Sequence, residues 1–505
     1  MLRPDGDDAY DGATCGEKAM ARGSPLIEHL LRRAGFGMSP DDLRFYETMS
    51  VATAIGRLLD YESVPDDVDD RIGNAAYAGV TARGTFSPNS NIEDARQRWL
   101  FRMIHSQRPL QEKMTLFWHN HFATLYSKLQ GTVGAGLGAK LMANKAGALP
   151  GPQGQIETIR QFAVGKFRDL LTEMSRDPAM LVFLDGRLNT RQRPQENFGR
   201  EIMELFTFGL GNYTEQDVYA AARVFTGWNI RLVRGADRSD ANSYYEFVFL
   251  ANQHETAAKT FTFPIYANGS RVIPARSAAN GMQDGLDLIA ALARHPETAR
   301  RLARKLWGFF VSEVLPPDPE FVTSCAAVYA ANDTEILPVV HYILRSRWFL
   351  SLTNSYARYA WPVEFVVRSV KEVGWSGLSV DTLRTPLTNM GQTLFEPPDV
   401  AGWELGEGWF STGAALARMN YAASVAFNQR FNLGRAAADA RTSPEALLSL
   451  FLDRFSPAPY DSEPYDGLLE YLRAGAAWTG SDAQLTTKAA GLTRLIVGSS
   501  EYQFM

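Results

Sequence analysis

The chain has 505 residues, of which 45% are hydrophobic and 21% charged, and its net charge is −5 at pH 7. These values are typical of a globular protein with an ample core, and the negative charge argues against a nucleic-acid partner held through its phosphates. Two cysteines far apart in the sequence, Cys15 and Cys325, exclude a disulfide framework.

The N-terminal segment, residues 1–23, is acidic and polar, and we expect it to be a disordered leader. It has neither the basic start nor the apolar stretch of a secretory signal, which favours a cytoplasmic location. No run of 18 apolar residues occurs, so we expect no membrane span. Helical periodicity begins at Leu26 and recurs to the end of the chain, which predicts one domain over residues 24–505.

One predicted helix, Leu110 to about Leu125, is apolar nearly all round and carries His119 and His121. Two residues apart, the histidines point about 200° away from each other on a helix, so one site can use both only where the helix ends or distorts. We favour His121, which shares a face with Phe117. The alternative is that each histidine is a hydrogen-bonded core residue.

The segment Gly131 to Gln155 is rich in glycine and alanine, but it lacks the Gly-Lys-Ser/Thr ending of a phosphate-binding loop. We therefore interpret it as a Gly-rich loop, residues 131–155, beside a site or between elements.

The most informative stretch is a predicted helix, Asn197 to Phe208, in which the usual amphipathic pattern is inverted. A narrow arc of about 100° carries Arg200, Glu201 and Glu204, and apolar residues cover the remaining surface. Buried charges must be paired, coordinated or hydrated, so this arc indicates an ion-pair network, a metal or an internal wet cavity. Arg200 neutralising Glu201 or Glu204 is the purely structural interpretation.

After Trp228 the pattern changes to short strands rich in aromatic and β-branched residues, near 229–233, 244–250 and 260–264. They predict a small β-hairpin or meander insertion over residues 229–265 in a helical body. His254 lies between two of these strands and is a further candidate for the same site.

Several motifs, in order along the chain, resemble the DUF1800 family of bacterial proteins, whose name denotes a domain of unknown function. They are His29-Leu-Leu-Arg-Arg-Ala-Gly-Phe-Gly37, Phe117-Trp-His-Asn-His-Phe122, Asn197-x-x-Arg-Glu-x-x-Glu-Leu-Phe-Thr-x-Gly209, Thr226-Gly-Trp228 and Pro397-Pro-x-Val-x-Gly-Trp403. The resemblance implies that the protein is encoded beside a second, sulfatase-like protein. Members often look exported and tend to have His-Asp where this chain has His254-Glu255.

We therefore expect a mainly α fold, a large multi-helix domain with a small β insertion. The first functional hypothesis is an enzyme, with Glu201, Glu204, Arg200 and His121 as catalytic residues acting on a small-molecule or glycan ligand. In its metal-dependent hydrolase form, a divalent metal is bound by His121, Glu201 and Glu204, with His119 and His254 as further ligands. The second hypothesis is a non-catalytic binding or maturation partner of a co-encoded enzyme, with the polar arc as a structural ion-pair network.

Overall fold

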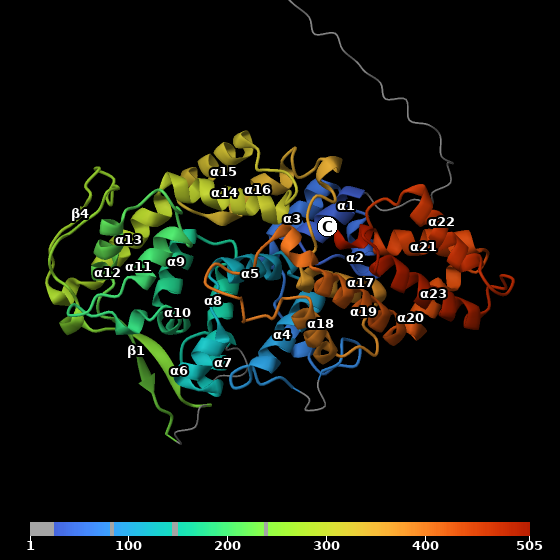
Figure 1. Ribbon diagram of the computed structural model, residues 1–505, viewed down its shortest axis with the longest axis horizontal. Helices are drawn as coiled ribbons and strands as arrows, with labels where there is room; N and C mark the ends of the chain where they lie inside the picture. Colours follow the sequence, from blue (N-terminus) through green and yellow to red (C-terminus); the bar gives the residue numbers. More distant parts are fainter. Residues whose placement is uncertain (1–24, 81–84, 144–149, 237–240) are drawn as a thin grey trace, which may run out of the picture.

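The computed structural model describes residues 25–80, 85–143, 150–236 and 241–505, and the predicted leader lies outside them. Helices dominate the described residues, which confirms the mainly α class (Figure 1). None of the helices in these ranges is long and apolar enough to cross a membrane.

Twelve α-helices come before the strands. They are α1 (Pro25–Arg33), α2 (Pro40–Tyr46), α3 (Val51–Leu59), α4 (Ile92–His105), α5 (Pro109–His121), α6 (Tyr126–Val133), α7 (Ala135–Ala143), α8 (Gln155–Gln161), α9 (Phe167–Arg176), α10 (Pro178–Phe183), α11 (Asn197–Glu204) and α12 (Glu215–Val224).

Eleven α-helices come after the strands in the described part of the chain. They are α13 (Met282–Arg294), α14 (Pro296–Phe310), α15 (Pro319–Ala331), α16 (Ile336–Arg345), α17 (Pro362–Val373), α18 (Arg384–Asn389), α19 (Thr412–Asn428), α20 (Arg430–Ala436), α21 (Pro444–Phe455), α22 (Ser462–Arg473) and α23 (Asp482–Val497).

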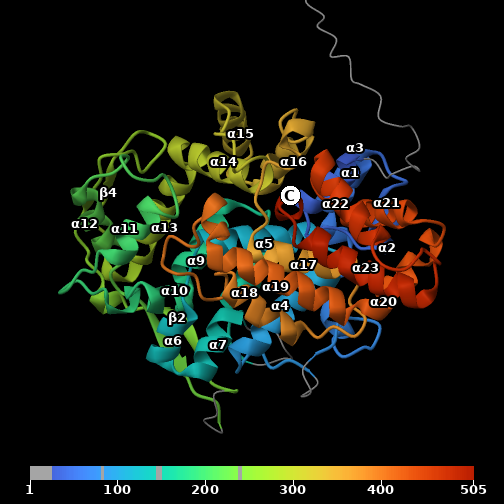
Figure 2. The ribbon, with the colours of Figure 1, turned by 45° about the vertical axis from the view of Figure 1, so that its right-hand side comes forward.

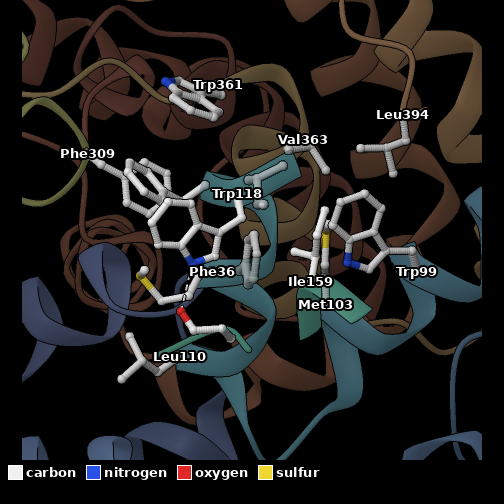
Figure 3. Close-up of a cluster of buried hydrophobic side chains, with 14 of the residues drawn as sticks. Phe36, Trp99, Met103, Leu110, Trp118, Ile159, Phe309, Trp361, Val363 and Leu394 are labelled. Carbon is white, nitrogen blue, oxygen red and sulfur yellow. Dashed lines mark hydrogen bonds between the residues drawn. The ribbon is translucent and has the colours of Figure 1, made fainter. Parts of the chain in front are cut away.

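The helix α5 is central, as its all-round apolar pattern predicts. Pro109 occupies its first turn, where the missing N–H costs nothing, and every later residue of the helix except Asn120 is buried. Figure 3 shows part of the core around it. The labelled side chains include Leu110 and Trp118 of α5, Trp99 of α4, Ile159 of α8, Phe309 of α14 and Val363 of α17.

Two adjacent charged residues of α5 are also fully buried, and each has its own set of partners. Glu112 accepts hydrogen bonds from Arg102 (2.7 Å) and Arg160 (2.9 Å). Lys113 forms an ion pair with Glu364 of α17. Because both charges are paired, the helix can lie in the core without an uncompensated ion.

The β insertion consists of two small two-stranded sheets among the described residues. Strands β1 (Trp228–Val233) and β2 (Tyr244–Phe249) form an antiparallel hairpin with Trp228 opposite Phe249. Strands β3 (Lys259–Thr260) and β4 (Val272–Ile273) form the second sheet. The third predicted strand, 260–264, is thus only a short strand at its start. Figures 1 and 2 show the insertion at one end of the molecule and α20–α23 at the other.

The predicted Gly-rich loop, residues 131–155, is wrong over its described first half. Residues 131–133 end α6, residues 135–143 form α7, and residues 144–149 lie outside the described part. Leu137, Leu141 and Met142 are buried, and this burial outweighs the low helix propensity of the glycines. Gly138 has a packing reason, since a Cβ there would lie 3.3 Å from the Tyr126 ring of α6.

Candidate functional site

The helix α11 places its acidic residues at the surface and not in the interior. Phe198, Ile202 and Met203 are buried, whereas Glu201 and Glu204 are partly exposed. The predicted buried polar arc is therefore wrong: the helix is an ordinary amphipathic one, and water covers the edge that the sequence pattern made appear enclosed.

Arg200 does not neutralise either of these carboxylates by an ion pair. Its guanidinium forms a forked pair with Glu215, at 2.8 and 2.7 Å, and lies 3.6 Å from Glu196. It therefore ties α11 to the first turn of α12. This pairing corrects the structural interpretation in which Arg200 served Glu201 or Glu204.

The two carboxylates of the arc have different surroundings. Glu204 accepts a hydrogen bond from the hydroxyl of Tyr213. Glu201 accepts no hydrogen bond and forms no ion pair within the described ranges. Desolvation and the neighbouring Glu204 charge raise the pKa of Glu201, against the smaller opposing effect of Arg200. Burial and the bond to Glu204 raise the pKa of Tyr213 to about 12.

Three cationic or polar side chains converge on the C-terminal end of α11. The Nη2 of Arg301 donates to the carbonyl of Leu205 at 3.2 Å, and His121 Nε2 lies 3.0 Å from the carbonyl of Phe206. Lys305 Nζ lies 3.1 Å from His121 Nδ1. The last carbonyls of a helix carry partial negative charge, so this placement stabilises α11.

The carbonyl of Phe206 fixes the tautomer of His121. A carbonyl oxygen only accepts, so Nε2 carries the proton and Nδ1 presents a lone pair, which receives a hydrogen bond from Lys305. Desolvation lowers the pKa of His121 well below its usual range, and Lys305 and Arg301 lower it further. Desolvation together with Arg301 lowers the pKa of Lys305 to about 7.

His119 is a core residue on another side of α5. Its Nε2 accepts a hydrogen bond from the backbone N–H of Phe395 at 3.2 Å, and its ring packs against Trp99 and Trp403. Complete burial lowers its pKa to about 3, which keeps the ring neutral. His119 therefore holds the loop that begins at Phe395.

His254 belongs to a separate buried network in the insertion. Its Nδ1 lies 2.9 Å from the carbonyl of Thr226 and its Nε2 lies 3.2 Å from Asp284. Asp284 also pairs with Lys259 and Arg276, each at 2.5 Å. The network joins β3 and the turn after α12 to α13.

The five predicted metal ligands are not gathered in one place. No group of three or more His, Cys, Asp or Glu side chains that could hold a metal ion occurs in the part of the chain that the structure describes. His121, His119 and His254 each bond to protein groups of a different region, and Glu201 and Glu204 lie at the surface. The donor set does not fit a divalent metal, because the imidazoles are already committed and do not converge with the carboxylates.

Three residues of this region could not be found from the sequence pattern. Tyr213 follows the turn after α11, and Arg301 and Lys305 lie one turn apart on α14. A long-range contact between α14 and the end of α11 brings the two cations to the site. Such a contact leaves no pattern in the local sequence from which it could be predicted. We define the α11–α14 site as Glu201, Glu204, Tyr213, Arg301, Lys305 and His121.

The comparisons with known proteins agree with the motifs. The family described as "Protein of unknown function (DUF1800)" matches residues 29–504, nearly the whole chain. No curated protein and no solved structure matches the chain. The chain therefore belongs to the DUF1800 family, whose function is not established.

Proposed function

We propose that the protein is an enzyme in which Glu201 acts as a general acid at the α11–α14 site. The observation that carries this proposal is the state of the Glu201 carboxyl group. It is half-buried, lies beside Glu204, and has no hydrogen-bond or ion-pair partner among the described residues. A carboxyl group whose pKa is raised by its surroundings holds a proton that it can deliver to a substrate.

The neighbouring groups supply the other requirements of such a site. Glu204, hydrogen-bonded to Tyr213, is a second carboxyl group on the same edge of α11. The charge of Arg301 acts on Glu204 and offers a binding point for an anionic part of a ligand. Two carboxyl groups in different surroundings suit the cleavage of a glycan or of another small-molecule ligand.

Arg200 and the metal have no part in this proposal. Both outer nitrogens of Arg200 are engaged by Glu215, and the imidazoles of His119, His121 and His254 have protein partners. His121 contributes by holding Lys305 and the end of α11 in position.

The test is turnover of a panel of chromogenic glycosides and esters by the wild-type protein, Glu201→Gln and Glu196→Gln. We expect Glu201→Gln to lower kcat by about 10²–10⁴-fold, the usual contribution of a general acid. Glu196→Gln is the matched control, since Glu196 is an exposed glutamate that precedes the same helix, and its one ion pair among the described residues is with Arg200 at 3.6 Å. Equal activity of all three proteins on a turned-over substrate would contradict the proposal.

The pH profile gives a second check of the role of Glu201. A general acid must be protonated, so kcat/KM should fall as the pH rises past the raised pKa of Glu201, above the usual value of 4.5. A profile that instead rises through this range would assign Glu201 as a base.

A non-catalytic role as a binding or maturation partner is the second candidate, and one observation favours it. The pairs Arg200–Glu215 and Glu204–Tyr213 connect α11 to α12 and to the turn between them, as a structural network would. Under this alternative, Glu204→Gln loosens the network and lowers stability, while no substrate of the panel depends on Glu201.

A further inference from the structure

The amine of Lys305 donates to a side-chain nitrogen, whereas the other buried or half-buried lysines that the structure describes pair with carboxylates or, like Lys140 and Lys488, donate to backbone carbonyls. Lys113, Lys166 and Lys259 each form an ion pair with a carboxylate. Lys305 has no carboxylate within ion-pair distance among the described residues, and its hydrogen bond goes to a neutral imidazole. A neutral acceptor orients an amine but stabilises its ammonium form less than a carboxylate does.

The orientation of the Lys305 amine is fixed by His121, which is itself held in place. His121 is enclosed by the rings of Phe117, Trp118, Phe122, Phe167 and Phe206, and its Nε2–H is held by the carbonyl of Phe206. Its Nδ1 lone pair therefore points in one direction, and Lys305 Nζ lies 3.1 Å along it. Lys305 itself remains partly exposed, so a ligand can reach it.

Arg301 adds a charge that both acts on the amine and serves a ligand. It precedes Lys305 by one helical turn, so both side chains lie on the same face of α14. Its positive charge disfavours protonation of Lys305. Only one of its nitrogens, Nη2, donates to a protein group among the described residues, and its Nε has no partner there. Because Nε is buried, Nη1 is the donor that remains for a carboxylate of a ligand.

We propose that Lys305 is a carbonyl-reactive amine that forms an imine with an aldehyde or ketone bearing an anionic group, such as an α-keto acid. His121 is a positioning residue for this amine, and Arg301 binds the anionic group. The inference goes beyond the proposed function and does not depend on Glu201.

The reaction balances without any further reagent. The ammonium group of Lys305 loses one proton to water, and the neutral amine adds to the carbonyl carbon, forming a C–N bond as the C–O π pair moves to oxygen. The nitrogen then loses one of its two protons while that oxygen takes one up, which gives the neutral carbinolamine. The carbinolamine hydroxyl takes up a second proton and leaves as water, and the nitrogen lone pair forms the C=N bond of the protonated imine. No oxidant is required, and only the trapping step in the test needs a reductant.

The test is reductive trapping of the full chain with glyoxylate and sodium cyanoborohydride at pH 7, with the modified lysines located by peptide mass spectrometry. Lys166 is the internal control, since it is more than a third exposed but paired with Asp333 at 2.9 Å. We expect Lys305 to be modified at least about tenfold faster than Lys166, because far more of its amine is neutral at pH 7.

Two further readouts make the outcome decisive. The rate of Lys305 modification should reach half of its maximum near pH 7. Lys305→Arg should remove this fast site while leaving the rate at Lys166 unchanged. Modification of Lys305 no faster than that of Lys166, a Lys305 rate with no half-maximum near pH 7, or no modification at all would overturn the proposal. Because trapping needs no turnover, it can succeed or fail independently of Glu201.

Discussion

The carboxylate of Asp177 stabilises a helix N-terminus by hydrogen bonds, but the burial of its negative charge destabilises the folded state. It caps α10, where its carboxylate accepts the N–H of Met180 at 2.8 Å, and it also accepts from Gln155 at 2.8 Å. These bonds satisfy a helix N-terminus. Complete burial nevertheless raises the pKa of Asp177 to about 7, because desolvation outweighs both hydrogen bonds.

This pKa predicts a pH-dependent loss of stability. The folded state binds the Asp177 proton more tightly than the unfolded state does, so the contribution of the group is fully present below about pH 4 and is lost as the pH rises to about 7. Asp177→Asn retains the capping oxygen and removes the charge. We expect urea unfolding to show the free energy of unfolding of this variant gaining about 3 kcal/mol on that of the wild-type protein between pH 5 and pH 8.

Asp318→Asn is the matched control for this change. Asp318 caps α15 in the same way, but it is partly exposed and its hydrogen bond from Trp348 lowers its pKa. Its contribution is already complete above the usual pKa of 3.8, so the effect of Asp318→Asn should be equal at pH 5 and pH 8. A constant difference between Asp177→Asn and the wild-type protein would contradict the assignment.

At the scale of elements, the turn after α11 decides where Arg301 lies. Gly209 and Gly211 both have φ +85°, a conformation that glycine adopts at little cost. A Cβ on Gly209 would lie 2.9 Å from Nη1 of Arg301, whereas a Cβ on Gly211 would meet nothing within 4 Å. The two positions therefore separate backbone strain from contact with the α11–α14 site.

We expect Gly209→Ala and Gly211→Ala each to lower the free energy of unfolding by about 1–2 kcal/mol, the usual penalty for a left-handed alanine. Only Gly209→Ala should also displace the Arg301 guanidinium, because this flexible side chain is what a methyl group would push away. Urea unfolding measures the first effect, and kcat/KM on a substrate found in the panel measures the second. Indistinguishable kcat/KM values for the two variants would argue against a role for Arg301.

Local sequence features predicted the helices well, but they did not predict which elements pack against each other. The capping box of Thr214 and Asp217, and the Asp177-Pro178 start of α10, are each formed within four residues, so motifs of this kind can be recognised in the sequence. The surroundings of Glu204 and Leu205 depend on Arg301 of α14, which begins about ninety residues later, so periodicity could not place them. The helical periodicity of the sequence showed correctly which residues share an edge of α11. It did not show whether protein or water covers that edge.

At the scale of the whole molecule, buried ion pairs connect helices far apart in the sequence. Glu364 of α17 pairs with Lys113 of α5 and accepts from Arg358 at 2.8 Å. Burial alone would raise the pKa of Glu364, but Arg358 and Lys113 lower it to about 2. All three side chains are fully buried, so the charges have no solvent to replace a lost partner.

We therefore expect Glu364→Gln to lower the free energy of unfolding by about 3–5 kcal/mol, since it leaves buried Lys113 without its anion and Arg358 with only the longer contact to Glu313, at 3.9 Å. Glu445→Gln breaks the exposed pair with Arg473 and should cost less than about 1 kcal/mol. Urea unfolding monitored by circular dichroism compares the two. Similar losses would mean that water reaches the Glu364 cluster.

The adjacent buried charges of α5 have a consequence for how this helix is held. Glu112 is tied to Arg102 and Arg160, and Lys113 is tied to Glu364, in two different directions around the helix axis. Turning α5 by one residue, about 100°, would bring Lys113 to the two arginines or Glu112 to Glu364, so that buried like charges would face each other. The two sets of ion pairs therefore fix the rotation of α5 about its own axis. This rotation in turn determines that His119 and His121 point to opposite sides of the helix.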